Sequence, residues 1–432
     1  MNKNRKSDEL PLIGFFPLFY NLAETGRAVL IAKEYMKKGG KAIFFSHGGE
    51  YEYLAEEIGC RVIRINPIYT EEFIDLLWKS SRLETFKNPF TIKNLKLHIE
   101  EEIKAFKKTN VKLIVSTNNF PCSISARAAK IPLIFVTPKV KIQFNKFPDF
   151  IDFPFLKLIP SFIKLSIINF IASNSKLYVK PFTKLAKKYN TKIPKNDFQI
   201  TQGDITLYTN YADLIGIEKS TIPKNEIYIG PILLEELFKN VIKDLDIIKE
   251  EKELKKHIDR NGRTILFSLG SSGTKEFFLK MLNTLNKTDY NVIAVYTNIL
   301  KEGDLPKLND NILLKKFVPS IKKINKLVDL AILHGGQGTV FTAAYSGKPV
   351  IGIPMQFEQH LNLEMLVNKG VAIIASKKYF NEKEFLKYIN KIFDDYDNYL
   401  NNSIDLAKKL PPSNGHINAL NYIEKYIADN EL

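Results

Sequence analysis

Cysteine is scarce in this chain, and its scarcity limits the class of protein that the chain can be. The 432 residues include only two cysteines, Cys60 and Cys122. Two thiols cannot supply the disulfide framework of a small secreted scaffold, and this usage suits a reducing cytoplasm. No cluster of Cys and His has the spacing of a zinc site either, so we predict no metal site and no cofactor.

Long apolar runs are also missing. No uncharged apolar stretch reaches the ~18 residues that a membrane-spanning helix requires. The N-terminus, MNKNRKSDEL, is polar and is not followed by the apolar region of a secretory signal. The chain also lacks a Walker loop and a serine elbow, which argues against P-loop nucleotidases and α/β-hydrolases. We therefore expect a cytoplasmic protein whose only membrane contact is peripheral, at the inner face.

Positive charge is concentrated in one part of the chain. The formal net charge is +16. Residues 104–195 contain eighteen Lys and Arg but only two acids, Asp149 and Asp152, so this segment carries the whole excess. Such a segment can contact nucleic acid, anionic lipid or an anionic substrate, or it can be a lysine-rich solvated surface. No aromatic-and-basic recognition motif accompanies it, so nucleic acid is not an expected partner.

Residues 147–173 combine apolar bulk with positive charge. The segment FPDFIDFPFLKLIPSFIKLSIINFIAS is interrupted by Pro154 and Pro160 and contains Lys157 and Lys164. This composition is what an interfacial membrane contact requires. The alternative is a helix that covers the sheet of the first domain. The sequence thus makes an anionic membrane surface a candidate partner of residues 104–195.

Short apolar runs alternate with helical stretches, which predicts an α/β fold with parallel sheets. The chain is too long for one compact core, so we place an N-terminal domain at residues 1–235 and a C-terminal domain at residues 236–432. In the first domain we expect strands at Pro11–Phe16, Ala42–Phe45, Val62–Ile65, Val111–Val115 and Leu133–Val136, and helices at Arg27–Lys38, Glu50–Ile58 and Cys122–Ala129. In the second we expect strands at Thr264–Leu269, Val292–Tyr296, Ile312–Lys315, Leu330–Leu333, Val350–Ile353 and Val371–Ile374.

The most informative segment is LAILHGGQGTVFTAAYSGKPVIGIPMQFEQHLN, Leu330 to Asn362. It predicts a strand, a Gly-rich turn, a helix, a second strand and an acidic turn. Glycine lets the backbone approach a ligand closely, and a helix N-terminus presents unpaired N–H groups with partial positive charge, so a pyrophosphate fits the first turn. In the second turn, Glu358 and Gln359 lie on a loop after a parallel strand and can bind the vicinal hydroxyls of a sugar.

This segment resembles the donor-binding signature of the UDP-glycosyltransferase superfamily, which has the GT-B fold. That superfamily includes macrolide and glucuronosyl transferases and, more distantly, the bacterial enzyme that forms lipid II. Its patterns H-G-G-x-G-[ST]-x-x-E-A-x-x-x-G-x-P and P-x-x-x-[DE]-Q-x-x-N are matched at His334, Gly335, Gly336, Gly338, Thr339, Ala343, Gly347, Pro349, Pro354, Glu358, Gln359 and Asn362. Phe317–Pro319 resembles the tract that frames the base, and FSLGSSG, Phe267 to Gly273, resembles the loop near the phosphates.

The resemblance implies two facing Rossmann-like domains with the active site in the cleft between them. The C-terminal domain would bind the nucleotide sugar and the N-terminal domain the acceptor, and the last helix, His416 to Ile427, would cross back to the first domain. The reaction would be an inverting, metal-independent transfer from a UDP-sugar or another nucleotide sugar to an acceptor hydroxyl. Separately from the resemblance, the basic, apolar segment in the first half favours a lipid-linked or membrane-apposed acceptor. The implied nucleotide-sugar contacts are Gly270, Ser271, Ser272, Val318, His334, Gly335, Gly336, Gly338, Thr339, Glu358 and Gln359.

Two departures from the family pattern affect the chemistry. Thr342 stands where the family usually has the glutamate that binds the ribose hydroxyls. In the first domain, Ala23-Glu24-Thr25-Gly26-Arg27 resembles the family's glycine–histidine turn before the opening helix, and Glu24 stands in place of the catalytic histidine. A carboxylate there can accept the proton of the attacking hydroxyl, particularly where burial raises its pKa. The alternative is a helix N-terminal Glu favoured by the helix dipole.

His47, in the turn SHGG, is the second candidate base, and its alternative is a loop histidine without a chemical role. Two other functions also fit the sequence. A nucleotide-sugar epimerase of the same architecture would release an altered UDP-sugar without any acceptor. A non-catalytic subunit that binds a sugar nucleotide, suggested by Glu24 and Thr342, would bind UDP without turnover.

Overall fold

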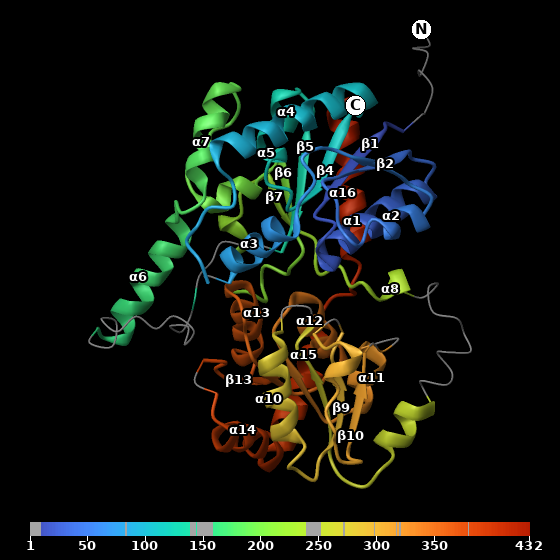
Figure 1. Ribbon diagram of the computed structural model, residues 1–432, viewed down its shortest axis with the longest axis vertical. Helices are drawn as coiled ribbons and strands as arrows, with labels where there is room; N and C mark the ends of the chain where they lie inside the picture. Colours follow the sequence, from blue (N-terminus) through green and yellow to red (C-terminus); the bar gives the residue numbers. More distant parts are fainter. Residues whose placement is uncertain are drawn as a thin grey trace. The chain divides into compact units, whose positions relative to one another are not determined.

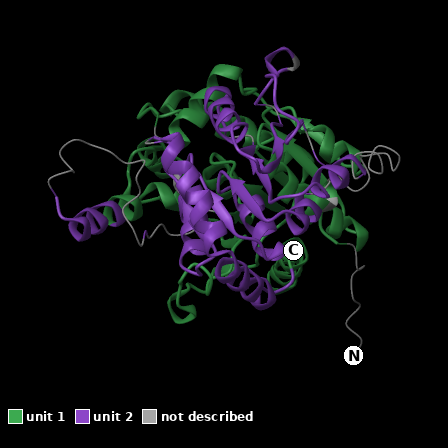
Figure 2. Cartoon of the chain, turned by 90° about the horizontal axis from the view of Figure 1, so that it is seen from below, with its two compact units in different colours: residues 1–142, 170–237, 413–432 green, residues 143–169, 238–412 purple. Residues whose placement is uncertain are grey.

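The chain folds into two compact units, which Figure 2 shows in different colours. The computed structural model describes residues 10–82, 84–138, 144, 159–238, 252–270, 273–297, 299–316, 318, 321–378 and 380–432. The first unit comprises residues 1–142, 170–237 and 413–432, and the second comprises residues 143–169 and 238–412. The C-terminal segment Ser413–Leu432 therefore belongs to the first unit, although it follows the whole of the second in sequence.

The first unit is built on a parallel sheet with the strand order β3-β2-β1-β4-β5-β6-β7. Its strands are β1 (Ile13–Pro17), β2 (Ala42–Ser46), β3 (Arg61–Arg64), β4 (Leu113–Thr117), β5 (Leu133–Thr137), β6 (Ile205–Tyr208) and β7 (Glu226–Tyr228). Its helices are α1 (Leu22–Lys37), α2 (Tyr53–Glu57), α3 (Glu71–Ser81), α4 (Ile92–Thr109), α5 (Cys122–Ala128), α7 (Val179–Lys188) and α16 (Gly415–Asp429). Two further helices, α6 (Ser161–Asn174) and α8 (Glu235–Phe238), cross the boundaries between the units.

The two faces of the first sheet are covered by different helices. On one face, Phe106 of α4 makes edge contacts with Phe16 of β1 and Phe45 of β2. Ile114 of β4 joins the same core cluster. Side chains alternate along a strand, so Thr117 faces the other side, where its hydroxyl donates to the backbone oxygen of Glu24 in α1 at 2.8 Å. On that side α1 lies beside α16 (Figure 1).

The second unit repeats this plan with the parallel order β10-β9-β8-β11-β12-β13. Its strands are β8 (Thr264–Ser268), β9 (Asn291–Val295), β10 (Ile312–Lys315), β11 (Leu330–Leu333), β12 (Val350–Gly352) and β13 (Ala372–Ile374). Its helices are α10 (Lys275–Leu285), α11 (Ile321–Leu327), α12 (Gln337–Ser346), α13 (Phe357–Val367), α14 (Glu382–Asp394) and α15 (Tyr396–Lys409). Among the described residues, no helix has both the length and the apolar character needed to cross a bilayer.

The α/β fold class is as predicted, and each expected strand is present within about two residues. Two strands, β6 and β7, were not expected. β7 contains only three half-buried residues and begins with Glu226, so it has no apolar pattern to detect. The prediction that the first helix begins at Arg27 was wrong. α1 begins at Leu22, because Asn21 Oδ1 accepts from the amides of Ala23 at 3.0 Å and Glu24 at 3.4 Å.

Candidate active site

The glycine-rich turn of the second unit follows β11 at the carboxyl edge of its sheet. Leu333, the last residue of β11, pairs with Ser268, the last residue of β8. From β8 the chain runs outward to β9 and β10 and then returns to β11 on the other side, so the strand order reverses between β8 and β11. Open α/β sheets bind their ligands at the carboxyl ends of strands beside such a reversal. The sheet therefore places the turn at the position that suits a ligand.

The two turns assigned to the diphosphate and the sugar are in contact. Gly335 has a φ of +89°, and a Cβ there would lie 2.6 Å from the carbonyl oxygen of Gln359. Asn362 Nδ2 donates to the carbonyl oxygen of Gly335 at 3.0 Å. Only glycine allows this backbone conformation and this close approach at position 335. The approach of the two backbones therefore requires glycine at 335 and is fixed by the Asn362 hydrogen bond.

His334 is enclosed by glycines. A Cβ at Gly270, after β8, would lie 2.5 Å from His334 Cε1, and a Cβ at Gly336 would lie 2.3 Å from Nε2. Burial lowers the pKa of His334 to about 4, so the imidazole is neutral at pH 7. The neutral ring fills the space between the β8 loop and the start of α12, and the two glycines leave room for it.

The N-terminus of α12 is open at Gly338. This residue is exposed, and a Cβ built on it would meet no atom within 4 Å. The helix begins at Gln337, and Gly336 is its N-cap. The amide of Val340 donates to the Gly336 oxygen at 3.0 Å. The amides of the first turn have no acceptor within the helix and carry partial positive charge. Such an end can bind a diphosphate.

Thr339 and Thr342 use their hydroxyls within α12. Thr339 Oγ1 donates to the Gly336 oxygen at 2.9 Å, and Thr342 Oγ1 donates to the Gly338 oxygen at 2.7 Å. Thr342 is buried, and its hydroxyl is engaged within the helix. A short hydroxyl engaged in this way does not replace the longer carboxylate that the family pattern has at this position.

Glu358 and Gln359 lie in the first turn of α13, so the expectation that they lie on a loop was wrong. The helix begins at Phe357, directly after an extended Gln356. Gln359 is buried, and its Oε1 accepts from the amide of Met355 at 2.7 Å, which binds the incoming chain to the helix start. Glu358 is half-buried. The pair is therefore held by a helix rather than by a loop.

The remaining predicted contacts of the second unit are described only in part. Val318 is buried in the core cluster with Leu266 and Ile293, so its side chain packs in the core. The backbone role that the resemblance implies for it stays a prediction. Ser271, Ser272, Phe317 and Pro319 lie outside the described residues.

Glu24 also lies beside a reversal in strand order, in the first unit. The strand order reverses between β1 and β4, and α1 follows β1. Glu24 is buried in the first turn of α1, where its Oε1 accepts from Arg27 Nη1 at 2.7 Å and from Asn118 Nδ2 at 2.7 Å. Its Oε2 is buried and has no hydrogen-bond partner among the described residues. The two hydrogen bonds to Oε1 thus fix the orientation of the carboxylate, and the lone pairs of Oε2 are not used in a hydrogen bond to a described residue.

His47 lies in a closed polar network. Its Nε2 lies 2.9 Å from Glu102 Oε1, and its Nδ1 lies 3.0 Å from the carbonyl oxygen of Ile65. His47 and Glu102 are both buried, and Ser125 donates to the second oxygen of Glu102. Both ring nitrogens are therefore engaged inside the first unit. This arrangement favours the structural interpretation of His47 over a role as the base.

His98 stacks edge-on against His47, with ring centroids 4.5 Å apart. It is buried, and its Nδ1 has no hydrogen-bond partner among the described residues. Burial, followed by the nearby His47, lowers the pKa of His98 to about 3. The folded first unit therefore contains a neutral histidine that the unfolded chain would protonate near its ordinary value.

Sequence reasoning missed three residues that organise these sites: Arg27, Asn118 and Glu102. Asn118 lies directly after β4, beside the end of β1, and it adopts a left-handed φ of +60°. Polar residues immediately after a buried strand were a signal that could have identified it. Glu102 lies 55 residues from His47, and no local pattern links them.

No group of three or more His, Cys, Asp or Glu suited to a metal ion occurs in the part of the chain that the structure describes.

Comparison with known proteins identifies the class of enzyme. Residues 264–411 match the glycosyltransferase family 28 C-terminal domain. The chain is 26% identical over 324 residues to the PGL/p-HBAD biosynthesis glycosyltransferase of Mycobacterium tuberculosis, covering 73% of this chain and 70% of that protein. The chain is a glycosyltransferase. It is also 31% identical over 155 residues to UDP-glucuronosyltransferase 2B16 of Oryctolagus cuniculus, covering 33% of this chain and 28% of that protein.

The fold of this glycosyltransferase is GT-B. Its structure is similar to that of glycosyltransferase VinC in complex with DTDP, with a TM-score of 0.61 and 13% identity over 96% of this chain and 100% of that one. At this identity the likeness concerns the fold. The predicted superfamily, fold class and enzyme class are thus confirmed, whereas the roles of the individual site residues stay predictions.

His98 makes the stability of this glycosyltransferase depend on pH. Because its native pKa of about 3 lies below the unfolded value near 6.5, its contribution is complete above pH 6.5 and is lost as the pH falls toward 3. At pH 5 the first unit should lose about 2 kcal/mol of unfolding free energy through His98 relative to pH 7. Urea unfolding followed by fluorescence of Trp78, the single tryptophan, measures this loss.

The variant His98→Phe is the control, because it keeps an aromatic ring and removes the titrating group. The decrease in unfolding free energy between pH 7 and pH 5 should be smaller in this variant by about the same 2 kcal/mol. Equal decreases in both proteins would contradict the assignment.

Proposed function

We propose that this glycosyltransferase transfers a sugar from a nucleoside diphosphate sugar, with UDP as the first candidate, to an acceptor hydroxyl with inversion and without a metal ion. The acceptor oxygen attacks the anomeric carbon as the bond from that carbon to the diphosphate breaks. The proton of the hydroxyl passes to Glu24, and the diphosphate leaves with the electron pair. A single displacement of this kind inverts the anomeric centre.

The open N-terminus of α12 carries this proposal. It offers amide groups and a partial positive charge to the leaving diphosphate at Gly338, and the hydrogen bond from Asn362 to Gly335 joins it to α13, the helix that contains Glu358. Fixed amides can stabilise a developing oxyanion without a metal, because they are already oriented before the reaction. The DTDP bound by VinC supports a nucleoside diphosphate as the ligand. We assign the diphosphate to Gly336, Gly338 and Thr339.

The sugar is assigned to the first turn of α13. Glu358 is half-buried there and offers a carboxylate to the sugar hydroxyls, and Gln359 is fixed through its oxygen to the Met355 amide. Because Asn362 links this helix to Gly335, a ligand that spans both helix ends binds one preformed surface.

Glu24 is the proposed base. Arg27 and Asn118 hold one carboxylate oxygen at 2.7 Å each, which fixes the orientation of the other. Oε2 has no hydrogen-bond partner among the described residues and is therefore the oxygen that would accept the proton. A positioned base typically contributes a factor of about 10²–10⁴ to the rate.

We further propose that the acceptor is lipid-linked and lies at the cytoplasmic face of a membrane. α6 exposes large apolar side chains, with Phe162 72% and Phe170 70% exposed. In the next helix, α7, Lys180 and Lys184 are exposed on the side opposite to its buried apolar residues. Exposed aromatic residues followed by lysines suit an interface with anionic lipid.

Glu24→Gln tests the base. The amide keeps an oxygen for Arg27 and Asn118 but cannot accept the proton, so kcat should fall by about 10²–10⁴. The measurement is nucleoside diphosphate release from UDP-, GDP- and TDP-sugars, each with lipid and soluble hydroxyl acceptors. Binding of UDP, measured separately by calorimetry, should not change.

His47→Gln is the matched comparison, since our assignment gives His47 no proton transfer. Its kcat should stay within a factor of about ten of the wild type once the folded fraction is equal. A Glu24→Gln enzyme with wild-type kcat would contradict the proposal. Formation of an altered nucleotide sugar without any acceptor would indicate the epimerase instead.

The variant Phe162→Ser/Phe170→Ser tests the membrane contact. Co-sedimentation with vesicles that contain anionic lipid should fall at least tenfold, because both exposed aromatic side chains are removed from α6. A control variant, Phe86→Ser/Leu327→Ser, also removes two exposed apolar side chains but lies outside α6. If the wild-type protein does not bind these vesicles even at low salt, the proposed membrane contact is contradicted.

A further inference from the structure

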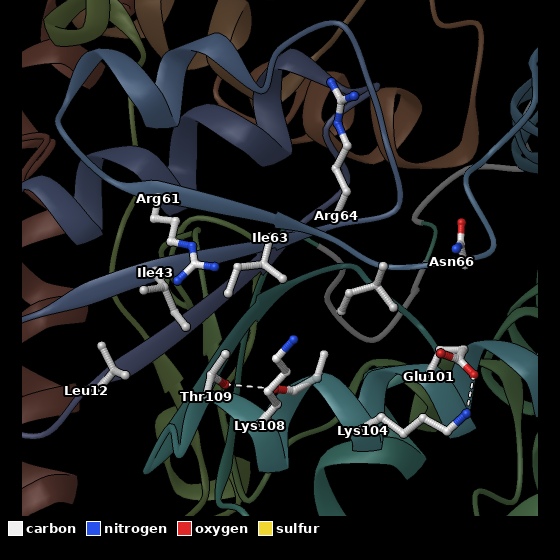
Figure 3. A pocket seen from close by; sticks show the side chains of 12 residues that line it. Leu12, Ile43, Arg61, Ile63, Arg64, Asn66, Glu101, Lys104, Lys108 and Thr109 are labelled. Carbon is white, nitrogen blue, oxygen red and sulfur yellow. Dashed lines mark hydrogen bonds and ion pairs between the residues drawn. The ribbon is translucent and has the colours of Figure 1, made fainter.

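A pocket of about 530 Å³ lies between α4 and the edge strands of the first sheet (Figure 3). Its floor is aliphatic and includes Ile43 of β2, Ile63 of β3 and Ala105 of α4. These residues are partly buried and pack against the core cluster of Phe45 and Phe106. The volume is in the range of small-molecule sites, which is about 300–1,000 Å³. The proposed sugar transfer does not use this pocket.

The pocket and Glu24 lie on opposite faces of the first sheet. Phe45 contacts Phe106 of α4, and Ile43, two residues earlier on β2, points to the same face. Thr117, which holds the backbone oxygen of Glu24, points to the other face. A ligand in the pocket would therefore be separate from the candidate base.

Cationic side chains surround the aliphatic floor. Lys104 Nζ is paired with Glu101 Oε1 at 2.6 Å, and Arg64 with Glu52 outside the pocket. Arg61 and Lys108 have no ion pair with any residue that the structure describes.

Figure 3 shows the guanidinium of Arg61 and the ammonium of Lys108 directed into the pocket, toward Ile63. Two uncompensated positive charges thus converge above an apolar surface. A guanidinium and an ammonium are both good partners for a phosphate group.

The side chains that line the pocket favour an anion with an aliphatic chain over a nucleotide or an inorganic anion. None of the described residues that line the pocket is aromatic, so a nucleobase would find no stacking partner. The aliphatic side chains suit an alkyl or isoprenoid chain, because the burial of its apolar surface is favourable. An inorganic anion would gain nothing from this part of the pocket.

We propose that this pocket binds an alkyl phosphate, with the phosphate between Arg61 and Lys108 and the chain on Ile43, Ile63 and Ala105. The site is separate from the proposed donor site and from the apolar surface of α6. It would let the first unit bind a phosphorylated amphiphile on the face opposite to Glu24.

Calorimetric titration of the full chain with octyl phosphate, below its micelle concentration, tests the proposal. One equivalent should bind, with a Kd at least tenfold lower than the Kd for inorganic phosphate or for octanol. Arg61→Gln/Lys108→Gln should weaken octyl phosphate binding at least tenfold, and Ile63→Ala should weaken octyl phosphate but not inorganic phosphate.

Lys93→Gln/Lys107→Gln is the matched control. It also removes two exposed positive charges, in this case from α4 outside the pocket, and should bind octyl phosphate as the wild type does. The Phe162→Ser/Phe170→Ser variant should also bind normally, which separates this site from α6. Unchanged binding by Arg61→Gln/Lys108→Gln overturns the proposal, as does equally tight binding of inorganic phosphate.

Discussion

The contact between the start of α12 and the start of α13 is the constraint on which the proposed donor site depends. At Gly335 the two backbones approach so closely that a Cβ would lie 2.6 Å from the Gln359 oxygen, and Asn362 fixes this distance with a hydrogen bond. Without the contact, the amides of one helix and the carboxylate of the other would belong to separate surfaces. With it, the proposed diphosphate and sugar subsites form one surface, and the neutral ring of His334 fills the space beside Gly270 and Gly336.

In both sheets the candidate residues lie beside the reversal in strand order, at the carboxyl ends of the central pair of strands. In each, the central pair of strands ends at the same level, and a helix begins beside that end. The second unit leaves this helix terminus open at Gly338, which suits an anion. In the first unit a buried carboxylate, Glu24, occupies the first turn of the helix, which suits a base. The two helices also follow different strands of the pair, since α1 follows the first strand, β1, and α12 follows the second, β11.

Much of the proposed donor site could be located from the sequence, because the residues that form it lie close together in the chain. The glycines after Leu333 and the Glu358–Gln359 pair lie within 30 residues, and apolar strands precede both turns. The first unit was less predictable, because Glu24 depends on Asn118 and His47 on Glu102, which are distant in sequence. The early start of α1 did leave a signal: Asn21 followed three residues later by Glu24 is typical of a helix N-terminus. No comparable sequence pattern indicates β7.

The central claim is that a diphosphate binds the amides at the start of α12. Gly338→Ala tests it most directly, because the added methyl group meets no protein atom within 4 Å but occupies the surface that the ligand would approach. Calorimetric binding of UDP and TDP should weaken at least tenfold without loss of thermal stability. Gly303→Ala, which also adds a methyl group to open space in the second unit, should leave binding unchanged. Wild-type affinity in Gly338→Ala would contradict the account.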